Sequence, residues 1–390
     1  MKFPNNHEQM DRLRMGQSDI FFANPSGLPE LAARNEVMAL CAGVLAPAAD
    51  ERILVLGCNH GALGVMLARY ACKGQVILSD PNLIALQAAQ RTLEINHIAN
   101  AVVNVETSLL PGLAGQLDRV IILAPQSRAL ARRWLVEALA LLRPGGTLNI
   151  AGANRGGILS QVSDASALFG PLIPVGIGKG CRVCQAQRPP QPPPPPDWAV
   201  QDGIAPGTWH SIEVKLPAGR RTLNTLPGVF SYEHLDPGTD LLLRNVALPP
   251  GGRVLDVGCG YGPIGLTAAA AGAAWVDMVD VNMLAVAAAR SNAQRYYLKG
   301  EVIAANGLET LAGRTYDVII SNPPFHSGSK VDTSATATMF AQSRRLLQPG
   351  GRLALVANRF LPYERLLANY FAQVAHVAED RSYQVIVCTA

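Results

Sequence analysis

Short apolar runs alternate with longer Ala/Leu-rich stretches along most of the chain. The runs "RVLDV", "WVDMVDV", "EVIAAN", "DVIIS" and "RLALVAN" have the length and continuous apolar character of parallel strands buried on both faces. The stretch between two of them, "MLAVAAARSNAQRY" (283–296), has the length and composition of a helix. This alternation predicts an α/β fold with a mostly parallel, doubly wound sheet, which binds ligands at the carboxyl ends of its strands.

The whole pattern occurs twice. "RILVLGCNHGALG" (52–64) is matched by "RVLDVGCGYGPIG" (253–265), and "DRVIILAPQ" is matched by "YDVIISNPP". Two further pairs keep the same order: "VILSDPNLIAL" with "VDMVDVNMLAV", and "LLRPGGTLNIAGANR" with "LLQPGGRLALVANRF". Matched segments in one order and at similar spacing indicate an internal duplication. We therefore predict two tandem Rossmann-like domains.

A proline-rich segment, "RPPQPPPPPD" (188–197), separates the two copies. Proline fixes φ and lacks an N–H group, so this run cannot join a helix or a sheet interior and favours an extended spacer. The alternative is a docking site for proline-binding modules. We predict a first domain at 1–187, a linker at 188–197 and a second domain at 198–390.

In the second copy, a predicted strand runs into a glycine-rich turn. Asp256 is followed by Gly258, Gly260 and Gly262, and glycines let the backbone turn tightly and approach a ligand. The G-x-G-x-G spacing, with an acid two residues before the first glycine, favours an ammonium group over a pyrophosphate. Asp280 ends the next strand, where a ribose diol needs an acceptor. An ammonium group plus a ribose indicates S-adenosylmethionine. The alternative is that Asp256 only caps the turn.

The fourth strand of the second copy ends in "SNPPFH" (321–326). We expect Asn322, the carbonyl of Pro323 and the ring of Phe325 beside the cofactor, because proline fixes φ and removes donors. The two acceptors can hold both N–H groups of an amine on a planar base, and the ring can stack on that base. Alignment then supplies most of the acceleration without a strong base, so His326 is not expected to act as one. A turn with an aromatic core plug is the structural alternative.

Together these motifs resemble those of one family. "TLPGVFS" (225–231), "VLDVGCGYG", "SNPPFH" and "VANRFLPY" (356–363) are similar to signatures of the bacterial ribosomal RNA guanine-N2 methyltransferases, which are class I methyltransferases. The resemblance covers residues 205–390, and the first copy resembles the family's degenerate N-terminal domain. It implies methyl transfer from S-adenosylmethionine to a guanine amine of ribosomal RNA, free or within a subunit. The 16S RNA of the small subunit is favoured.

The resemblance also implies a role for each matching residue. The cofactor-binding positions are Asp256, Gly258, Gly260, Gly262, Asp280 for the ribose, Asn306 for the adenine, and Asn322. The catalytic positions are Asn322, Pro323, Pro324 and Phe325. Phe230 is a candidate lid over cofactor or base, with a buried core aromatic as the alternative. Phe325 and Arg359 are further candidate substrate contacts.

The first copy lacks most of these residues. Val55 and Asn59 replace the aspartate and the second glycine of the loop, and Ala124 and Gln126 replace the asparagine and second proline of "NPPF". Asp80 remains at the position of the ribose carboxylate. We predict that the N-terminal domain neither binds the cofactor well nor catalyses, and that it engages RNA and supports the fold.

Three arginines of the first copy are candidate phosphate contacts. Arg128, Arg132 and Arg133 lie in one predicted helix at spacings that place them on a shared face. The alternative is an ordinary solvated face.

Three other functions remain open from the motifs. The first is methylation of a guanine of 23S RNA. The second is methylation of a protein glutamine or a DNA adenine, since N-P-P-[FY] also serves those amines. The third is a non-enzymatic RNA-binding factor with a vestigial pocket, which fits the first copy alone.

Composition says little about the partners and location of the protein. The formal charge is +4, from 33 basic and 29 acidic residues, which permits a nucleic-acid partner without arguing for one. Seven scattered cysteines indicate reduced thiols, and the single C-x-x-C pair, Cys181 and Cys184, favours packing over a metal site. No apolar window reaches the ~18 residues of a membrane span. We expect a cytoplasmic protein without metal or membrane partner; a monomer is slightly favoured.

Overall fold

The computed structural model describes residues 10–16, 18–25, 28, 31–108, 110–323 and 333–390. Its internal contacts divide the chain into an N-terminal unit, Met1–Trp209, and a C-terminal unit, His210–Ala390. Each unit is an α/β sandwich and is described separately below.

The N-terminal unit contains a hairpin and a seven-stranded sheet of order β5-β4-β3-β6-β7-β9-β8. The hairpin is β1 (Met10–Met15) and β2 (Ser18–Ala23); the sheet strands are β3 (Arg52–Leu56), β4 (Gln75–Ser79), β5 (Ala101–Asn104), β6 (Leu117–Leu123), β7 (Leu142–Ala153), β8 (Ile173–Gly178) and β9 (Cys181–Gln187). The helices are α1 (Leu31–Val44), α2 (Ala62–Tyr70), α3 (Leu83–Ile95), α4 (Leu110–Leu113), α5 (Arg128–Leu141) and α6 (Ile158–Phe169), with short 3-10 turns η1 (Asn154–Gly156) and η2 (Asp197–Val200). Strands β3 to β7 are parallel, whereas β9 runs antiparallel to both β7 and β8.

The C-terminal unit repeats this topology, with sheet order β14-β13-β12-β15-β16-β18-β17. Its hairpin is β10 (His210–Leu216) and β11 (Gly219–Thr225); its sheet strands are β12 (Arg253–Val257), β13 (Trp275–Asp280), β14 (Val302–Ala304), β15 (Tyr316–Ser321), β16 (Leu347–Asn358), β17 (Gln373–Glu379) and β18 (Tyr383–Thr389). Its helices are α7 (Pro237–Asn245), α8 (Pro263–Ala270), α9 (Met283–Arg295), α10 (Thr333–Leu346) and α11 (Tyr363–Leu367), with the 3-10 turn η3 (Glu309–Leu311).

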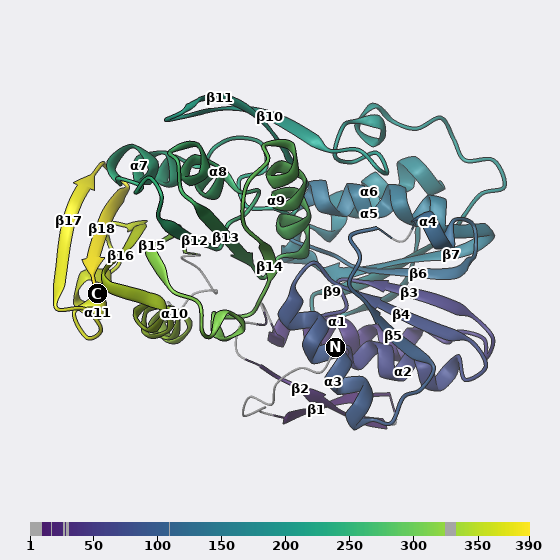
Figure 1. Ribbon diagram of the computed structural model, residues 1–390. Coiled ribbons are helices and arrows are strands. Elements are labelled where there is room, and N and C mark those ends of the chain that lie inside the picture. The colour runs from purple at the N-terminus through teal and green to yellow at the C-terminus, as the bar shows by residue number, and fades with distance from the viewer. Residues whose placement is uncertain (1–9, 17, 26–27, 29–30, 109, 324–332) are drawn as a thin grey trace. The chain divides into compact units, whose positions relative to one another are not determined.

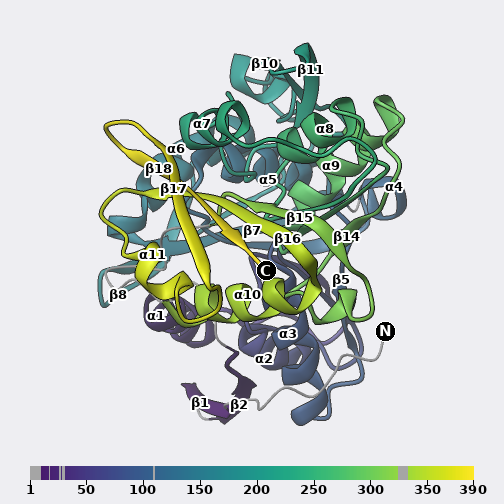
Figure 2. The same ribbon diagram turned by 60° about the vertical axis from the view of Figure 1, so that its left-hand side comes forward.

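Helices cover both faces of each sheet (Figures 1 and 2). Helices α1, α2 and α3 lie on one face of the N-terminal sheet, with α5 and α6 on the other. Helices α7, α8 and α9 take the corresponding face of the C-terminal sheet, and α10 and α11 the opposite one. The predicted pair of doubly wound domains is therefore confirmed. The two hairpins and the antiparallel edge strands are additional elements that the apolar pattern did not predict.

The division between the units falls later than the proline-rich segment. After the prolines, the chain returns to α5, where the Arg132 guanidinium lies 4.8 Å from the centre of the Trp198 ring. Arg133 donates to the carbonyl of Gly203 at 2.7 Å. These contacts join residues 198–209 to the N-terminal unit, although the sequence placed the start of the second domain at 198.

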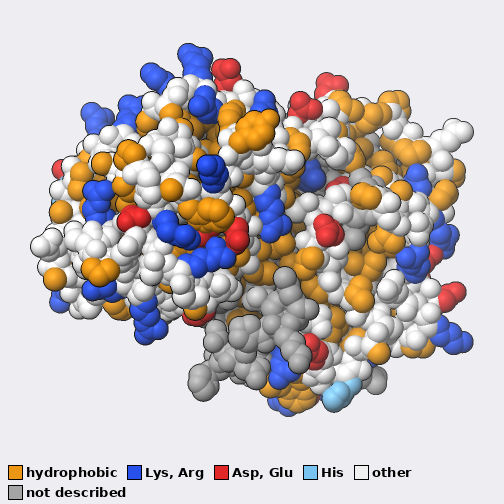
Figure 3. Space-filling view, in the orientation of Figure 1, with side chains coloured by type: hydrophobic (Ala, Val, Ile, Leu, Met, Phe, Trp, Pro, Cys, Tyr) orange, Lys and Arg blue, Asp and Glu red, His pale blue; other side chains and the backbone are white. Residues whose placement is uncertain are grey.

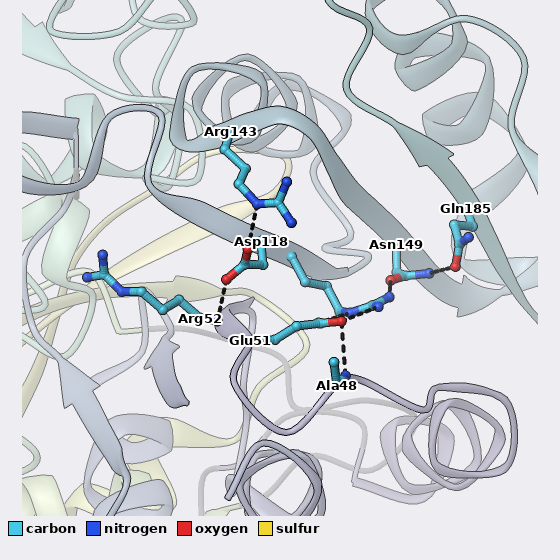
Figure 4. A network of polar contacts seen from close by, with 8 residues as sticks. Ala48, Glu51, Arg52, Asp118, Arg143, Asn149 and Gln185 are labelled. Carbon is cyan, nitrogen blue, oxygen red and sulfur yellow. Dashed lines mark hydrogen bonds and ion pairs between the residues drawn. The ribbon is translucent and has the colours of Figure 1, made fainter. Parts of the chain in front are cut away.

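A polar network crosses the N-terminal sheet (Figure 4). Arg119 on β6 donates to Glu51 at 2.7 Å and to Asn149 on β7 at 2.8 Å, and Asn149 donates to Gln185 on β9 at 3.1 Å. The strand registers give the three counterparts of Arg119, Asn149 and Gln185 in the C-terminal sheet, and all are apolar: Val318, Ala354 and Val387. The two units thus share a topology but fill one stripe of the sheet differently.

Candidate functional site

The glycine loop of the C-terminal unit follows β12 and is open on one side. Gly258, Gly260 and Gly262 all have positive φ, at 72°, 56° and 91°. The N–H groups of Gly258 and Cys259 donate to the carbonyl of Val279 at 2.9 and 3.0 Å, which fixes the loop against β13. A Cβ added at Gly258 would lie 4.0 Å from the nearest described atom, and one at Gly260 would meet no described atom within 4 Å. The loop therefore leaves room for a ligand close to the backbone.

Asp280, at the end of β13, holds this loop in place. One carboxylate oxygen accepts the Gly260 N–H at 2.8 Å, and the other accepts the Asn282 N–H at 2.8 Å. Burial raises the pKa of Asp280, while these backbone bonds oppose the rise. A carboxylate has about four acceptor positions, so Asp280 retains acceptor capacity for a diol.

Asp256 is fully buried beneath the loop. Its Oδ2 accepts the Gly265 N–H of α8 at 2.9 Å, in agreement with the capping alternative. Its Oδ1 has no hydrogen-bond partner among the described residues. Burial, together with a smaller contribution from the charge of Asp280, raises the pKa of Asp256 to about 8. The unpartnered oxygen and the open loop together fit a ligand that carries a cationic donor.

Asn322, directly after β15, has both amide hydrogens engaged. Its Nδ2 donates to Asp236 Oδ2 at 2.9 Å and to Thr239 Oγ1 at 2.8 Å. A carboxylate can only accept, so the nitrogen must face Asp236 and the amide oxygen must face the other way. The group that Asn322 can offer to a substrate is therefore an acceptor.

Asp236 and Thr239 are site residues that the sequence reasoning missed. Asp236 is the N-cap of α7, and its Oδ2 also accepts the Thr239 N–H at 2.8 Å. Both side chains are buried. The sequence "LDPGTD" does carry a helix-start signal, an aspartate followed by proline at the first helical position. That signal predicts a helix start but does not predict that its N-cap residue lies next to Asn322 at the end of β15.

The "LPGVF" loop is fastened to the same edge of the sheet. The carbonyl of Gly228 accepts from Asn282 Nδ2 at 2.8 Å, and the carbonyl of His234 accepts from Tyr261 Oη at 3.3 Å. Phe230 between them is 65% exposed, so the alternative of a buried core aromatic is wrong. The ring is therefore exposed on a loop that is fixed beside the glycine turn.

The remaining predicted residues of the C-terminal unit differ in their placement. Asn306 is exposed just after β14, and the neighbouring Ala305 N–H donates to the Asp280 carbonyl at 3.0 Å. Pro323 is buried beside Asn322. Three predicted residues lie outside the part of the chain that the structure describes: Pro324, Phe325 and His326.

Arg359 is already engaged within its own unit. Its guanidinium lies 3.4 Å from Glu379 Oε2 and donates to the Asp380 carbonyl at 3.3 Å. A substrate contact by Arg359 would have to compete with this pairing.

The three arginines of α5 do not share one face. Arg128 and Arg132 both donate to the carboxylate of Asp164, at distances between 2.7 and 3.0 Å. Arg133 is instead buried, with Gly203 as its partner. The expected common face is therefore wrong for Arg133, because a spacing of five residues turns it ~140° around the helix from Arg128.

The strand registers also correct the match between the two copies. Asp118 and Asp317 each accept the first N–H of the neighbouring strand, at 2.7 Å in both units. Counting along the strands from these equivalent aspartates makes Leu123 the counterpart of Asn322. The sequence comparison had aligned Ala124 with Asn322, one residue out of register. Leu123 is fully buried and has no side-chain acceptor.

The N-terminal counterpart of the site is filled by its own side chains. His60 stacks on Phe22 with ring centroids 3.9 Å apart, and burial lowers its pKa to about 3. A Cβ added at Gly57 would lie 2.9 Å from the Leu123 carbonyl and 3.4 Å from the Trp134 ring. The cavity left beside Trp134 measures about 20 Å³, which is room for about one water.

The C-x-x-C pair belongs to the core. Cys181 and Cys184 are both buried in β9, and residues three apart in a strand point to opposite faces. In the part of the chain that the structure describes, no three His, Cys, Asp or Glu side chains converge as a metal site requires. Likewise, none of the described helices is long and apolar enough to cross a membrane.

Comparison with known proteins agrees with this geometry. The family model for the methyltransferase small domain matches residues 38–165 and 220–387. The ribosomal RNA small subunit methyltransferase C of Chromohalobacter salexigens is 33% identical over 285 residues, covering 72% of this chain and 81% of the relative. That of Pseudomonas paraeruginosa is 35% identical over 272 residues, covering 70% and 79%.

A solved structure extends the likeness to nearly the whole chain. The T. thermophilus 16S rRNA N2 G1207 methyltransferase, in complex with AdoMet and guanosine, superposes with a TM-score of 0.78 at 26% identity and covers 98% of both chains. The chain therefore belongs to the ribosomal RNA small subunit methyltransferase C family.

Proposed function

We propose that the chain transfers a methyl group from S-adenosylmethionine to the N2 amine of a guanine in 16S ribosomal RNA. The names of its relatives support the RNA, and the neighbour in complex with AdoMet and guanosine supports the cofactor and the base. The observation that carries the chemistry is the orientation of Asn322, whose amide hydrogens are held by Asp236 and Thr239.

The carboxyl edge of the C-terminal sheet supplies the cofactor site. The open glycine loop would hold the methionine part, with the unpartnered oxygen of Asp256 available to its ammonium group. Asp280 would accept from the ribose, and Asn306 would meet the adenine. The bound cofactor supplies an electrophilic methyl group on a sulfonium.

The chain's own residues hold the amine. Its lone pair is delocalised into the guanine ring, so the amine is a poor nucleophile. Asn322 Oδ1 and the Pro323 carbonyl would accept its two N–H groups and direct the nitrogen lone pair at the methyl group. Such alignment, with acceptors fixed before the reaction, lowers the barrier without a strong base. From the sequence, Phe325 is expected to stack on the base and Phe230 to close over it.

The N-terminal unit takes a different role in this proposal. Its pocket is filled, so it supports the fold and engages RNA rather than binding the cofactor. Arg128 and Arg132 remain candidates for phosphate contact, although each already binds Asp164.

The test is a map of modified nucleosides in ribosomal RNA from a strain lacking this protein. One N2-methylguanosine should disappear from 16S RNA and return with the wild-type gene, but not with Asn322→Ala. Loss of N2-methylguanosine from 23S RNA would show instead that the substrate is the RNA of the large subunit. Intact N2-methylguanosine in both RNAs would refute the proposal.

A further inference from the structure

The C-terminal unit also has a cavity at the amino ends of its sheet strands, away from the candidate site at their carboxyl ends. It measures about 410 Å³ and is lined by β11, the ends of α8 and α9, and the segments that precede β13 and β14. It thus lies at the amino ends of these strands, whereas Asn322 and Asp280 stand at carboxyl ends. Neither the cofactor site nor the amine acceptors reach it. Its polar and aromatic lining residues are Arg221, Tyr296, Tyr297 and Lys299.

A tyrosine that lines the cavity joins the hairpin to α9. Tyr296 Oη accepts from the Thr222 N–H at 3.1 Å and donates to the Thr222 carbonyl at 2.9 Å. In the N-terminal unit, a short asparagine joins the hairpin to α3: Asn96 Nδ2 donates to the Phe21 carbonyl at 2.7 Å. The two units thus fasten the hairpin to the helix through side chains of different length and chemistry.

The two units also differ in what lies against this junction. Equivalent bonds, Ala23 N–H to Thr92 and Asn224 N–H to Asn292, set the match between the two hairpins. The residue at the position of Arg221 is then Ile20, which is fully buried. The duplicated fold can therefore take an apolar side chain at this position. The N-terminal unit brings a cation to its junction from α2 instead, where Arg69 donates to Asn96 Oδ1 at 3.4 Å.

The chemistry of the lining suits a nucleotide. The Arg221 guanidinium lies 5.4 Å from the centre of the Tyr296 ring, Arg295 lies 6.0 Å from the same ring, and Lys299 is exposed at the rim. No Asp or Glu is among the described lining residues. Lys and Arg side chains gather over the neighbouring hairpin in Figure 3. Cations interleaved with aromatic rings are the usual means of holding phosphates and unstacked bases.

Tyr297 adds an observation that packing does not explain. Its side chain is 91% exposed, and its φ is +51°, in the region that favours glycine. His97 has the same conformation at the matching place, with φ +55°, so the backbone shape belongs to the fold. Glycine would serve that shape better, yet the chain keeps a large ring in open water.

We propose that this cavity is an accessory RNA-binding site. Arg221 and Lys299 bind a backbone phosphate, and Tyr297 stacks on a neighbouring base. The inference rests on the proposed function insofar as ribosomal RNA is the substrate. Because the cavity is on the opposite edge from Asn322, it holds a part of the RNA away from the reacting guanine. Its loss should raise KM for RNA and leave kcat unchanged.

The decisive variant is Tyr297→Gly in the full chain. Removing a strained residue should leave Tm equal or higher, whereas removing the stacking ring should weaken binding of fluorophore-labelled 16S RNA at least about fivefold. Tyr297→Ala should weaken binding similarly, and Tyr70→Ala, a half-exposed tyrosine of the N-terminal unit, should not. Unchanged RNA affinity in both Tyr297 variants would overturn the site.

The cations are tested by salt dependence. Arg221→Ala and Lys299→Ala should each reduce the slope of log affinity against log salt by about 0.7 to 0.9. Arg244→Ala, an exposed cation paired with Asp240 on α7, is the control and should keep the wild-type slope. Equal slopes for all three variants would refute phosphate binding here. If AMP displaces the RNA with an affinity equal to that of the RNA itself, the cavity is a small-molecule site instead.

Binding and turnover separate this inference from the proposed function. If the wild type binds 16S RNA but does not methylate it, the proposed function fails, and the binding assays still decide the cavity. If the wild type methylates the RNA and the Tyr297 variants show no change in KM, the cavity proposal fails alone. Absence of RNA binding by the wild type would overturn both.

Discussion

The two units of this chain are copies of one topology that differ most clearly in chemistry at the carboxyl ends of the sheet strands. In the C-terminal unit, β15 is followed by Asn322, with its amide oriented by the N-cap of α7. In the N-terminal unit, the equivalent residue is the buried Leu123, whose carbonyl accepts from Arg34 of α1 at 3.3 Å. The first edge offers acceptors to a ligand, and the second satisfies its own groups internally.

The loop that follows the first sheet strand, β3 or β12, nevertheless keeps the same backbone features in both units. Asp80 holds the Asn59 and Asn82 N–H groups at 3.0 and 2.9 Å, as Asp280 holds its own loop. Asn59 even keeps the positive φ of Gly260. Loop shape and a carboxylate are therefore requirements of the fold, whereas an open surface and an oriented acceptor are requirements of the chemistry. The comparison between the units can be tested at each of these features.

The largest effect is expected at the amine acceptor. Asn322→Ala should reduce kcat for methyl transfer about 10²- to 10³-fold or more, because an acceptor fixed for the transition state is lost. Cofactor affinity measured by calorimetry should stay close to wild type. Asn104→Ala, which removes an asparagine at the end of β5 in the N-terminal unit, is the matched control and should retain full turnover. Wild-type turnover by Asn322→Ala would remove Asn322 from the mechanism.

The two carboxylates provide the next test. Asp280→Ala should weaken S-adenosylmethionine binding about 10- to 100-fold, because charge-assisted hydrogen bonds to the ribose are lost. Asp80→Ala removes the same two backbone bonds in the N-terminal unit and should leave affinity unchanged. Calorimetry on the full chain should give one cofactor per chain in the wild type. A second binding event that Asp80→Ala abolishes would show that the N-terminal pocket is functional.

Much of this picture could be predicted from sequence, for identifiable reasons. Continuous apolar runs such as 253–257 and glycines before helices reveal parallel strands and their turns. The position of Asp280 at a strand end follows from the same pattern. The hairpins could not be found in this way, because they pack on helices and carry no continuous apolar run.

Side-chain partners were harder to predict. That Asp236 faces Asn322 depends on which strand end lies beside the α7 N-terminus, 86 positions away in the chain. That Leu123 rather than Ala124 is the counterpart of Asn322 follows from the strand register. An alignment of two apolar sequences does not fix that register to within one residue. The inward turn of Arg133 depends on what α5 packs against.

The positioning of Asn322 is the third point to test. Thr239→Val keeps the side-chain shape but leaves one amide hydrogen of Asn322 without its acceptor. We expect kcat to fall about tenfold with little change in KM for RNA, since an unsatisfied buried donor costs roughly 1–2 kcal/mol. Thr267→Val on α8 removes a buried hydroxyl that, among the described residues, donates to the Pro263 carbonyl, and it should retain activity. Thr239→Ser should restore most of the activity; if it does not, Thr239 acts through packing alone.

The smallest net effect is expected from exchanging the polar stripe of the N-terminal sheet for its apolar counterpart. Asn149→Ala alone should lower the free energy of unfolding by about 1–3 kcal/mol, because Arg119 and Gln185 lose their shared partner in a buried setting. The triple variant Arg119→Val, Asn149→Ala, Gln185→Val instead installs apolar residues like those of the C-terminal sheet.

Because the triple variant leaves none of those three groups unpaired, it should unfold within about 1 kcal/mol of the wild type in a denaturant titration of the full chain. Glu51 would keep one partner, since its Oε1 also accepts the Ala48 N–H at 3.1 Å. If the triple variant is instead less stable than Asn149→Ala, the polar network is required by the N-terminal unit itself. The two sheets would then be interchangeable in topology but not in the residues that fill them.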